Sequence, residues 1–308
     1  MFILDNPTLR PVALGLTAIG VLAGAVGTFA VVRRQSLQGD AISHAALPGV
    51  ALAFMFGGRS PLMILLGAAV TGWLAMSLVK GIVSRSRVPF DTALAGALSV
   101  FFGFGLVLMT YLRKLNEVLS TRPAEGVLEE WLEPHARDAT KHGLEKYLFG
   151  QAAFLEDADV TTIVALGATI LAMLALFWKQ FKLASFDREF AASLGFPMRA
   201  LDYLMTSLIV FTVVLGLQFV GVVLMSALLV APVVAARQWV DRLGVLCLLA
   251  GIIGGFAGFA GAVIGHQRSG LPAGPVVVLA VTAIVVASIL FAPRRGLVWG
   301  SKKVRVTG

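Results

Sequence analysis

The chain has 308 residues, of which 58% are hydrophobic and only 14% are charged, and its mean hydropathy is +0.88. A soluble domain carries about 25% charged residues, so this chain has too little polar surface to coat a water-soluble globule. The net charge of +8 is spread over short loops rather than gathered in one patch, which argues against a nucleic-acid partner. A single cysteine, Cys247, excludes an intramolecular disulfide and a cysteine-cluster metal site.

Apolar stretches of membrane-spanning length follow one another along the whole chain. A spanning helix needs about 20 mostly apolar residues. Nine stretches satisfy this, at about 11–32, 40–56, 61–79, 92–112, 160–178, 200–216, 219–236, 243–264 and 275–292. The division near Leu217 and Gln218 is the least marked, so eight or ten spans are the alternatives. We therefore predict an all-α, polytopic transmembrane helix bundle that forms a single domain over residues 1–308.

Lysine and arginine are divided unequally between the two sides of this predicted bundle. One side carries sixteen of them, whereas the short loops of the other side hold only Arg10, Arg59 and Arg268. Because cytoplasmic loops carry the excess of positive charge, we predict that the N-terminus lies outside and the C-terminus in the cytoplasm. The long polar segment at about 113–159 then lies outside the cell, since long segments cross the membrane largely regardless of their charge.

The first segment with chemical character is SLQGDAISHAALPGVALAF, residues 36–54. On a helix, Asp40 and His44 share one face, with Ser43 beside them. A carboxylate and an imidazole with this spacing can bind one divalent cation, and the mixed oxygen and nitrogen ligands suit Mn, Fe or Zn better than Ca or Mg. An acid at mid-depth in the bilayer costs about 2.5–3.5 kcal/mol, so Asp40 is expected to face a cavity or a partner.

Two simpler interpretations of this pair remain open. Asp40 follows Gly39 and would serve as the N-cap of the second span, and His44 would be a buried histidine bonded to a neighbouring carbonyl. Hydropathy also places Asp40 near the cytoplasmic end of its span. A helix broken around Gly39 and bent at Pro48 would remove that objection.

The second segment is SFDREFAASLGFP, residues 185–197, the longest cytoplasmic connection between predicted spans. It begins with a capping-type residue, Ser185, and an acidic first turn, and it ends at Gly195 and Pro197, which are helix stop signals. We expect a short amphipathic helix there. The residues alone leave open whether it is an ordinary loop or a docking element.

The third segment is GVVLMSALLVAPVVAAR, residues 221–237, an apolar span interrupted by Ser226 and Pro232. Pro232 predicts a kink, and Ser226 either bonds its own backbone or contacts a substrate. The fourth is the span 243–264, where glycine pairs four residues apart (251/255, 254/258 and 261/265) predict close helix packing.

Hydrolytic and nucleotide-binding motifs are missing from the sequence. It contains no GxxxxGK[ST] phosphate loop, no HExxH and no GxSxG. The chain is therefore expected to be no enzyme, and any ATP hydrolysis that drives it is expected in a separate subunit.

Five ordered segments resemble the manganese/zinc/iron permease family of bacterial ABC transporters. They are QSLQGDAISHAALPGVALAF (35–54), GLEKYLFGQAA (143–153), FDREFAASLGFP (186–197), GVVLMSALLVAPVVAAR (221–237) and LPAGPVVVLA (271–280) with APRRG (292–296). The resemblance implies a permease in the bacterial cytoplasmic (inner) membrane that imports a divalent metal ion by alternating access. Its partners would be a second permease subunit (identical or related), an ABC ATPase subunit in the cytoplasm and an extracytoplasmic metal-binding protein.

The same resemblance assigns roles to particular residues. It implies that Asp40 and His44 contact the metal, with Ser43 and Ser226 as candidate lining of the pathway. The segment at about 181–198 resembles a coupling helix that seats on the ATPase, with its E-x-A-x-x-x-G core at Glu189, Ala191 and Gly195. The residues expected to couple to the ATPase are Phe186, Asp187, Glu189, Ala191, Gly195 and Pro197.

The transported metal is a substrate, and no permanently bound cofactor is expected. GLEKYLFGQAA and SFDREFA look more like the manganese/iron branch of the family. Manganese is therefore the favoured ion, with zinc and iron as alternatives.

Two other classes of function fit the sequence less well. An ion-gradient-driven carrier commonly has acidic residues in several spans and an inverted repeat, and neither is evident here. An intramembrane enzyme would need a second catalytic acid or a serine–base pair in adjacent spans, and Asp91 and Asp202 are the only candidates.

Overall fold

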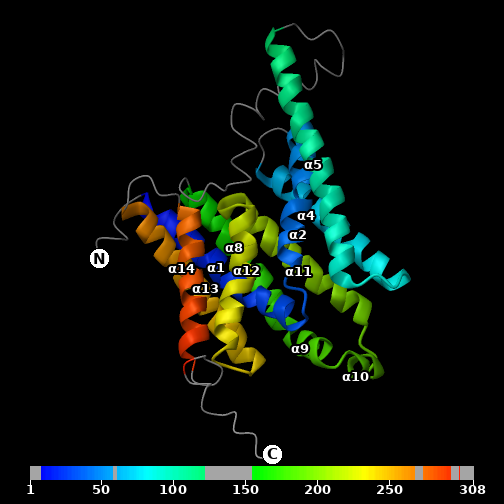
Figure 1. The fold of residues 1–308 in the computed structure, drawn as a ribbon, viewed down its shortest axis with the longest axis vertical. Coiled ribbons are helices and arrows are strands. Elements are labelled where there is room, and N and C mark those ends of the chain that lie inside the picture. Colours follow the sequence, from blue (N-terminus) through cyan, green and yellow to red (C-terminus); the bar gives the residue numbers. More distant parts are fainter. Residues whose placement is uncertain (1–7, 58–60, 122–154, 268–272, 293–297, 299–308) are drawn as a thin grey trace, which may run out of the picture. The chain divides into compact units, whose positions relative to one another are not determined.

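A computed structural model describes residues 8–57, 61–121, 155–267, 273–292 and residue 298, and its regular structure there is α-helical (Figure 1). The helices are α1 (Leu9–Val32), α2 (Gln38–Ala45), α3 (Leu47–Gly57), α4 (Pro61–Arg85), α5 (Phe90–Thr121), α8 (Asp157–Leu176), α9 (Trp178–Phe186), α10 (Arg188–Ser193), α11 (Met198–Val220), α12 (Val222–Arg237), α13 (Leu243–Gln267) and α14 (Ala273–Phe291).

Eight helical stretches in the described residues are long and apolar enough to cross a membrane, with α2 and α3 counted together as Gln38–Phe56. A ninth apolar stretch, Leu224–Arg237 in α12, is shorter. The predicted all-α polytopic bundle of eight or nine spans is thereby confirmed. The side of the membrane on which each terminus lies stays a prediction.

The weakly marked division between the sixth and seventh predicted spans lies at Gly221. This residue has φ +90°, a left-handed conformation that glycine adopts without a Cβ clash, and it separates α11 from α12. The break therefore comes a few residues after the predicted one at Leu217 and Gln218.

Two compact units are formed by the chain. The first comprises residues 1–36, 152–212 and 224–308, and the second comprises 37–151 and 213–223. Whether they make up the single domain predicted from sequence stays a prediction. Of the predicted outer segment at about 113–159, α5 covers the first residues and α8 the last. Residues 122–154, which include GLEKYLFGQAA, lie outside the described residues, as does most of APRRG.

Within the first unit, α1 and α13 touch backbone to backbone. A Cβ built on Gly20 would lie 2.1 Å from the carbonyl oxygen of Gly254, and one on Gly258 would lie 2.3 Å from that of Leu16. Real Cβ contacts do not come closer than about 3.0 Å, so no side chain fits between these helices. The close packing predicted from the 254/258 spacing is confirmed. Its partner, α1, was not evident from the sequence.

Aromatic rings anchor α9 to the C-terminal part of α1. The ring of Phe29 meets Trp178 edge to face at 5.5 Å and Phe181 at 6.1 Å between centroids. Phe29 and Phe181 are fully buried. Such aromatic pairs stabilise the folded state by about 0.5–1.5 kcal/mol beyond the effect of their buried area. They hold α9, the helix that leads to α10, against α1.

In the second unit, small residues hold α3 against its neighbours. A Cβ on Gly49 would lie 2.0 Å from the carbonyl oxygen of Gly67 in α4, and one on Gly105 of α5 would lie 2.9 Å from the Cβ of Leu47. The helix that carries the predicted metal ligands thus continues into a segment packed tightly between α4 and α5.

Candidate functional site

The side chains of Asp40 and His44 lie close together on α2. Asp40 is in its first turn and His44 in its last, and the Oδ1 atom of Asp40 is 3.6 Å from Nε2 of His44. The side chains are 45% and 27% exposed, respectively. The shared face that the four-residue spacing predicted is present, with a gap between the two atoms longer than a hydrogen bond.

Neither of the simpler interpretations finds its expected contact. The N-cap of α2 is Leu37 rather than Asp40. The Nδ1 atom of His44 is buried and has no hydrogen-bond partner among the described residues. Both side chains therefore keep ligand capacity that neither capping nor a carbonyl contact uses.

The helix break that would remove the depth objection to Asp40 does not lie at Gly39, because the interruption is at Ala46. Gly39 is inside α2, and the next helix begins at Leu47. Pro48 has no N–H to donate to the carbonyl of His44, which explains the interruption there. The amide of Ala46 still donates a hydrogen bond to the carbonyl of Ile42 at 2.9 Å, and the amide of Val50 donates one to the carbonyl of Ala46 at 3.0 Å. The chain therefore stays locally helical.

An aromatic ring on α5 orients the imidazole. The rings of His44 and Phe102 meet edge to face, with centroids 4.9 Å apart and an interplanar angle of 79°. Sequence reasoning missed this residue, because nothing distinguishes it from the other phenylalanines of an apolar span.

The other polar residues of α2 are buried. The hydroxyl of Ser43 donates to the carbonyl of Gly39 at 2.9 Å, so its proton is committed to its own helix. Gln38 is 1% exposed, and its Oε1 atom has no hydrogen-bond partner among the described residues. Sequence reasoning passed over this amide. Its signal was a polar side chain at the edge of an apolar stretch.

The described residues contain no group of three or more His, Cys, Asp or Glu side chains that could hold a metal ion. Asp40 and His44 are therefore a pair of candidate ligands rather than a complete group of three.

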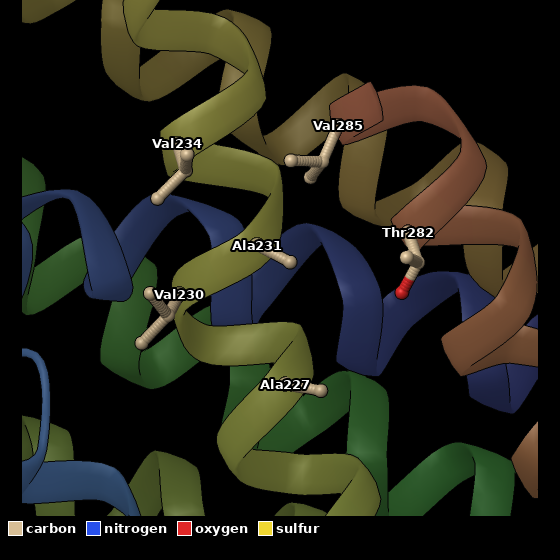
Figure 2. A pocket seen from close by; sticks show the side chains of 6 residues that line it. All are labelled: Ala227, Val230, Ala231, Val234, Thr282 and Val285. Carbon is tan, nitrogen blue, oxygen red and sulfur yellow. The ribbon is translucent and has the colours of Figure 1, made fainter. Parts of the chain in front are cut away.

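Ser226 is half-buried on α12, in the first unit. Near it in sequence, Figure 2 shows a pocket lined by α12 and α14. Its lining residues are Ala227, Val230, Ala231, Val234, Thr282 and Val285. This lining contains no titratable side chain, and its one polar side chain is the hydroxyl of Thr282.

The predicted coupling segment folds as two short helices separated by Asp187. The Oδ1 atom of Asp187 accepts a hydrogen bond from the amide of Phe190 at 2.9 Å, so Asp187 caps α10. The expected capping role of Ser185 is wrong. This serine lies in the last turn of α9, where its hydroxyl donates to the carbonyl of Phe181 at 2.7 Å.

The end of α10 explains the spacing of Ala191 and Gly195. Gly195 has φ +83°, and its amide donates to the carbonyl of Ala192 at 3.0 Å. The amide of Phe196 donates to the carbonyl of Ala191 at 3.3 Å. These two bonds form a Schellman motif, whose left-handed position favours glycine. Ala191 is buried, whereas Glu189 and Pro197 are exposed.

Large apolar side chains around α10 face outward. Phe186 is 63%, Phe190 52% and Leu194 56% exposed. These three residues, called here the α10 apolar surface, lie outside the helices long enough to span a membrane. Large contiguous patches of exposed apolar groups mark interaction sites, whereas single exposed apolar residues are normal.

The structure also bears on the class of the protein. Of the two aspartates that an intramembrane enzyme could use as a second acid, Asp91 and Asp202, the carboxylate of Asp202 accepts a hydrogen bond from Arg33 and, at 2.5 Å, makes an ion pair with Arg188. The bundle, with its accessible carboxylate–imidazole pair and its exposed connecting helix, has the character of a membrane transport protein.

Comparison with known proteins gives the family. The chain belongs to the ABC 3 transport family, whose profile matches residues 5–121 and 133–292. It is 42% identical over 300 residues to the zinc transport system membrane protein TroC of Treponema pallidum, covering 97% of this chain and 94% of that protein. It is 39% identical over 304 residues to the manganese transport system membrane protein MntC of Bacillus subtilis, covering 98% of this chain and 65% of that protein.

Solved structures agree on the fold. PsaBC from Streptococcus pneumoniae, in complex with Fab, superposes with a TM-score of 0.76 at 30% sequence identity, covering 95% of each chain. An inward-facing metal-chelate type ABC transporter superposes with a TM-score of 0.64 at 14% identity, covering 91% of this chain and 84% of that one, which shows likeness of fold alone.

Family membership makes this chain a multi-pass membrane permease of a bacterial ABC importer. Such a permease has no ATPase domain of its own. Membership therefore implies an ATPase partner and a binding-protein partner.

Proposed function

We propose that this permease imports divalent metal ions at the expense of ATP, with manganese as the favoured ion and zinc and iron as the alternatives. The support comes from relatives named for zinc and for manganese transport and from ligand types that suit these metals. Manganese and zinc both fit the Asp40 and His44 pair, so transport measurements must separate them.

The observation that carries the proposal is the geometry of Asp40 and His44. Two ligand atoms about 2.1 Å from one ion, at octahedral to tetrahedral angles, lie about 3.0–3.4 Å apart. The observed separation between Oδ1 and Nε2 is 3.6 Å, so a small side-chain rotation would let both atoms bind one ion. Both side chains are partly exposed, so an ion could reach them.

Two protein ligands suit transport better than storage. Conduction requires binding strong enough for the ion to enter and weak enough for it to leave. In our proposal the binding protein releases the ion toward Asp40 and His44, with Ser43 and Ser226 lining the pathway. The permease then changes from outward- to inward-facing as the ATPase closes. A second permease subunit, identical or related, would complete the pathway.

The segment at about 181–198 would seat on the ATPase. The α10 apolar surface supplies the exposed contact area, and Asp187, Ala191 and Gly195 give α10 its defined start and end. Glu189 and Pro197 are exposed and would meet the partner directly. With the N-terminus outside and the C-terminus in the cytoplasm, as the distribution of lysine and arginine favours, α10 lies on the side of the ATPase.

Uptake of radiolabelled Mn, Zn and Fe in cells with and without this chain tests the function. We expect ATP-dependent uptake of one metal to require the chain and to be abolished by Asp40→Ala and by His44→Ala. Asp91→Ala, which removes an exposed carboxylate in the first turn of α5, is the matched control and should transport normally. Uptake that survives inactivation of the ATPase would indicate a gradient-driven carrier instead. Normal uptake in both α2 variants would refute the site.

Topology has its own test, because the chain has one cysteine. In a Cys247→Ala background, Thr8→Cys should react with a membrane-impermeant maleimide in intact cells. Arg199→Cys should react only after the cells are opened. The reverse pattern would contradict the proposed orientation.

A further inference from the structure

One carboxylate outside the metal pair joins three helices of the first unit. The Oδ1 atom of Asp202, near the start of α11, accepts a hydrogen bond from Nη2 of Arg33 at the end of α1. Its Oδ2 atom is 2.5 Å from Nη2 of Arg188, the first residue of α10. No motif drew attention to this cluster, because its members are 155 and 14 residues apart in sequence (33 to 188, and 188 to 202).

The three charges differ in burial. The side chains of Arg33 and Asp202 are only 13% and 14% exposed, whereas that of Arg188 is 60% exposed. The buried pair is neutral by itself. Removing one partner of such a pair is strongly destabilising, because it leaves a buried charge uncompensated. Arg188 is therefore the member that can be removed or displaced while the pair stays intact.

A strained turn presents Arg33 to this cluster. Arg34 has φ +58°, its amide donates to the carbonyl of Val31 at 3.0 Å, and that of Gln35 donates to Ala30 at 2.8 Å. This is a second Schellman motif, with arginine where glycine is usual. The left-handed conformation costs a non-glycine residue about 1–2 kcal/mol. The end of α1 is thus defined by its turn as well as by its ion pair.

The α1 helix is in turn packed directly against the backbones of α12 and α13. Gly20 meets the backbone of Gly254 in α13, and a Cβ on Gly27 would lie 1.9 Å from the carbonyl oxygen of Leu229 in α12. Close-packed helices move together, because no flexible side chain can absorb a displacement between them. A displacement of α10 that reaches Arg33 would therefore also reach α12 and α13.

We propose that Asp202 is a positioning residue of the transport cycle, which through Arg188 and Arg33 connects α10 to α1. The proposal rests on the proposed docking of α10 on the ATPase. The peptide chain joins α10 to α11 directly, and the rings around Phe29 join α9 to α1. The cluster links α10 to α1 through the carboxylate of Asp202 in α11, so that movement of α10 acts on α1 as well.

The test uses the purified complex of this chain and its ATPase subunits in liposomes. The binding protein is added, and uptake of Mn²⁺ and of Zn²⁺ is measured in parallel. ATP hydrolysis and metal uptake are recorded together, as ions transported per ATP. For Arg188→Gln we expect normal co-purification of the ATPase, continued hydrolysis and about fivefold fewer ions per ATP, at the low end of coupling between distant sites. An unchanged ratio would overturn the proposal.

A double-mutant cycle separates this role from a direct contact of Arg188 with the ATPase. If Arg188 acts through Asp202, the double variant Arg188→Gln/Asp202→Asn should couple no worse than Asp202→Asn alone. Independent, additive losses would overturn the proposal. Asp202→Glu keeps the charge and should recover part of the ratio. If the Asp202 variants fail to assemble, the result for Arg188→Gln decides.

The controls distinguish the possible failures. Arg199→Gln removes an exposed charge from the same end of α11 and should leave the ratio unchanged. A purely structural role for the cluster would lower the amount of assembled complex without changing ions per ATP, and that result would also overturn the proposal. Absence of ATP-driven uptake in the wild-type complex would refute the proposed function itself, whereas normal wild-type transport with normal coupling in Arg188→Gln would refute only the role of Asp202.

Discussion

The two polar clusters of this protein use an aspartate in opposite ways. On α2, Asp40 and His44 stand 3.6 Å apart, partly exposed, with the Nδ1 atom of His44 lacking a hydrogen-bond partner in the described structure. At the start of α11, Asp202 is 14% exposed, and each of its carboxylate oxygens is held by an arginine. The first cluster has ligand capacity left over, and the second has used its capacity on the protein itself.

This difference suggests how to distinguish an aspartate that binds a ligand from one that connects helices in a sequence with few charged residues. Both aspartates are expensive to place in or near a membrane, so charge alone does not tell them apart. The state of their hydrogen bonds does. The partly exposed ligand atoms of the α2 pair support our proposal that an ion binds there, whereas a carboxylate held by two arginines connects helices.

The largest expected effects come from alanine variants of the two aspartates, each measured both for metal uptake and for the free energy of unfolding. Asp40→Ala should lower metal uptake by more than about 100-fold, because loss of a direct ligand should exceed the 10–100-fold cost of losing a supporting residue. Asp202→Ala should instead lower the free energy of unfolding by about 3 kcal/mol, because Arg33 is left buried without its partner. Uptake in cells and thermal unfolding in detergent measure the two effects.

The contrast between the two aspartates would be lost if Asp40→Ala were strongly destabilised or if Asp202→Ala lost metal uptake without losing stability. Asp40→Ala should unfold within about 0.5 kcal/mol of wild type, as expected for a substitution away from a packed core. Asp91→Ala serves as the control in both assays. A strongly destabilised Asp40→Ala protein would make that residue a structural one as well.

A smaller effect is expected from the ring that orients His44. Phe102→Leu should weaken metal binding at the α2 pair by about 2–10-fold, because an edge-to-face contact is worth about 0.5–1.5 kcal/mol. Titration of the purified permease with Mn²⁺ and Zn²⁺ measures this. Phe104→Leu, at an exposed position of the same helix, should bind like wild type. Equal weakening in both variants would remove the special role of Phe102.

The smallest effect concerns the turn beside Arg33. Arg34→Gly should raise the free energy of unfolding by about 0.5–1 kcal/mol, because glycine adopts the left-handed conformation without strain. Thermal unfolding detects the change, and Gln35→Gly, one residue later, should not stabilise. A loss of stability on Arg34→Gly would show that the side chain of Arg34 itself contributes to the cluster.

The spans and the α2 pair could be predicted from sequence because both are local. Hydropathy places each span within a few residues, and the four-residue spacing brings Asp40 and His44 together on any helix. The end of α10 was also predictable, since Gly195 is the residue that its left-handed turn requires. The metal role of the α2 pair stays a prediction.

Errors arose where two local signals competed. Ser185 and Asp187 are both good N-caps, and only the break in the structure shows that Asp187 caps α10 while Ser185 bonds back into α9. Similarly, Gly39 suggested a break, but Pro48 produces it, because a missing amide interrupts a helix more strongly than a flexible residue does.

Contacts between distant segments were out of reach. The glycine spacing in α13 predicted a close partner but not that it is α1, because a small-residue face fits any other small-residue face. The contacts of Phe102 with His44 and of Arg33 with Asp202 have no sequence signature for the same reason. These contacts depend on which helices meet, and one sequence does not contain that information.

The contact between α1 and α13 has a consequence for biosynthesis. Gly20 and Gly254 are separated by 234 residues. At the usual rate of about 5–20 residues per second, a ribosome needs about 10–50 s to make the second helix after the first. During that time the glycine face of α1 sits in the membrane without its partner. Assembly of the first unit therefore has to wait until nearly all of the chain has been inserted, and a nascent chain halted before α13 would expose that face to chaperones and proteases of the membrane.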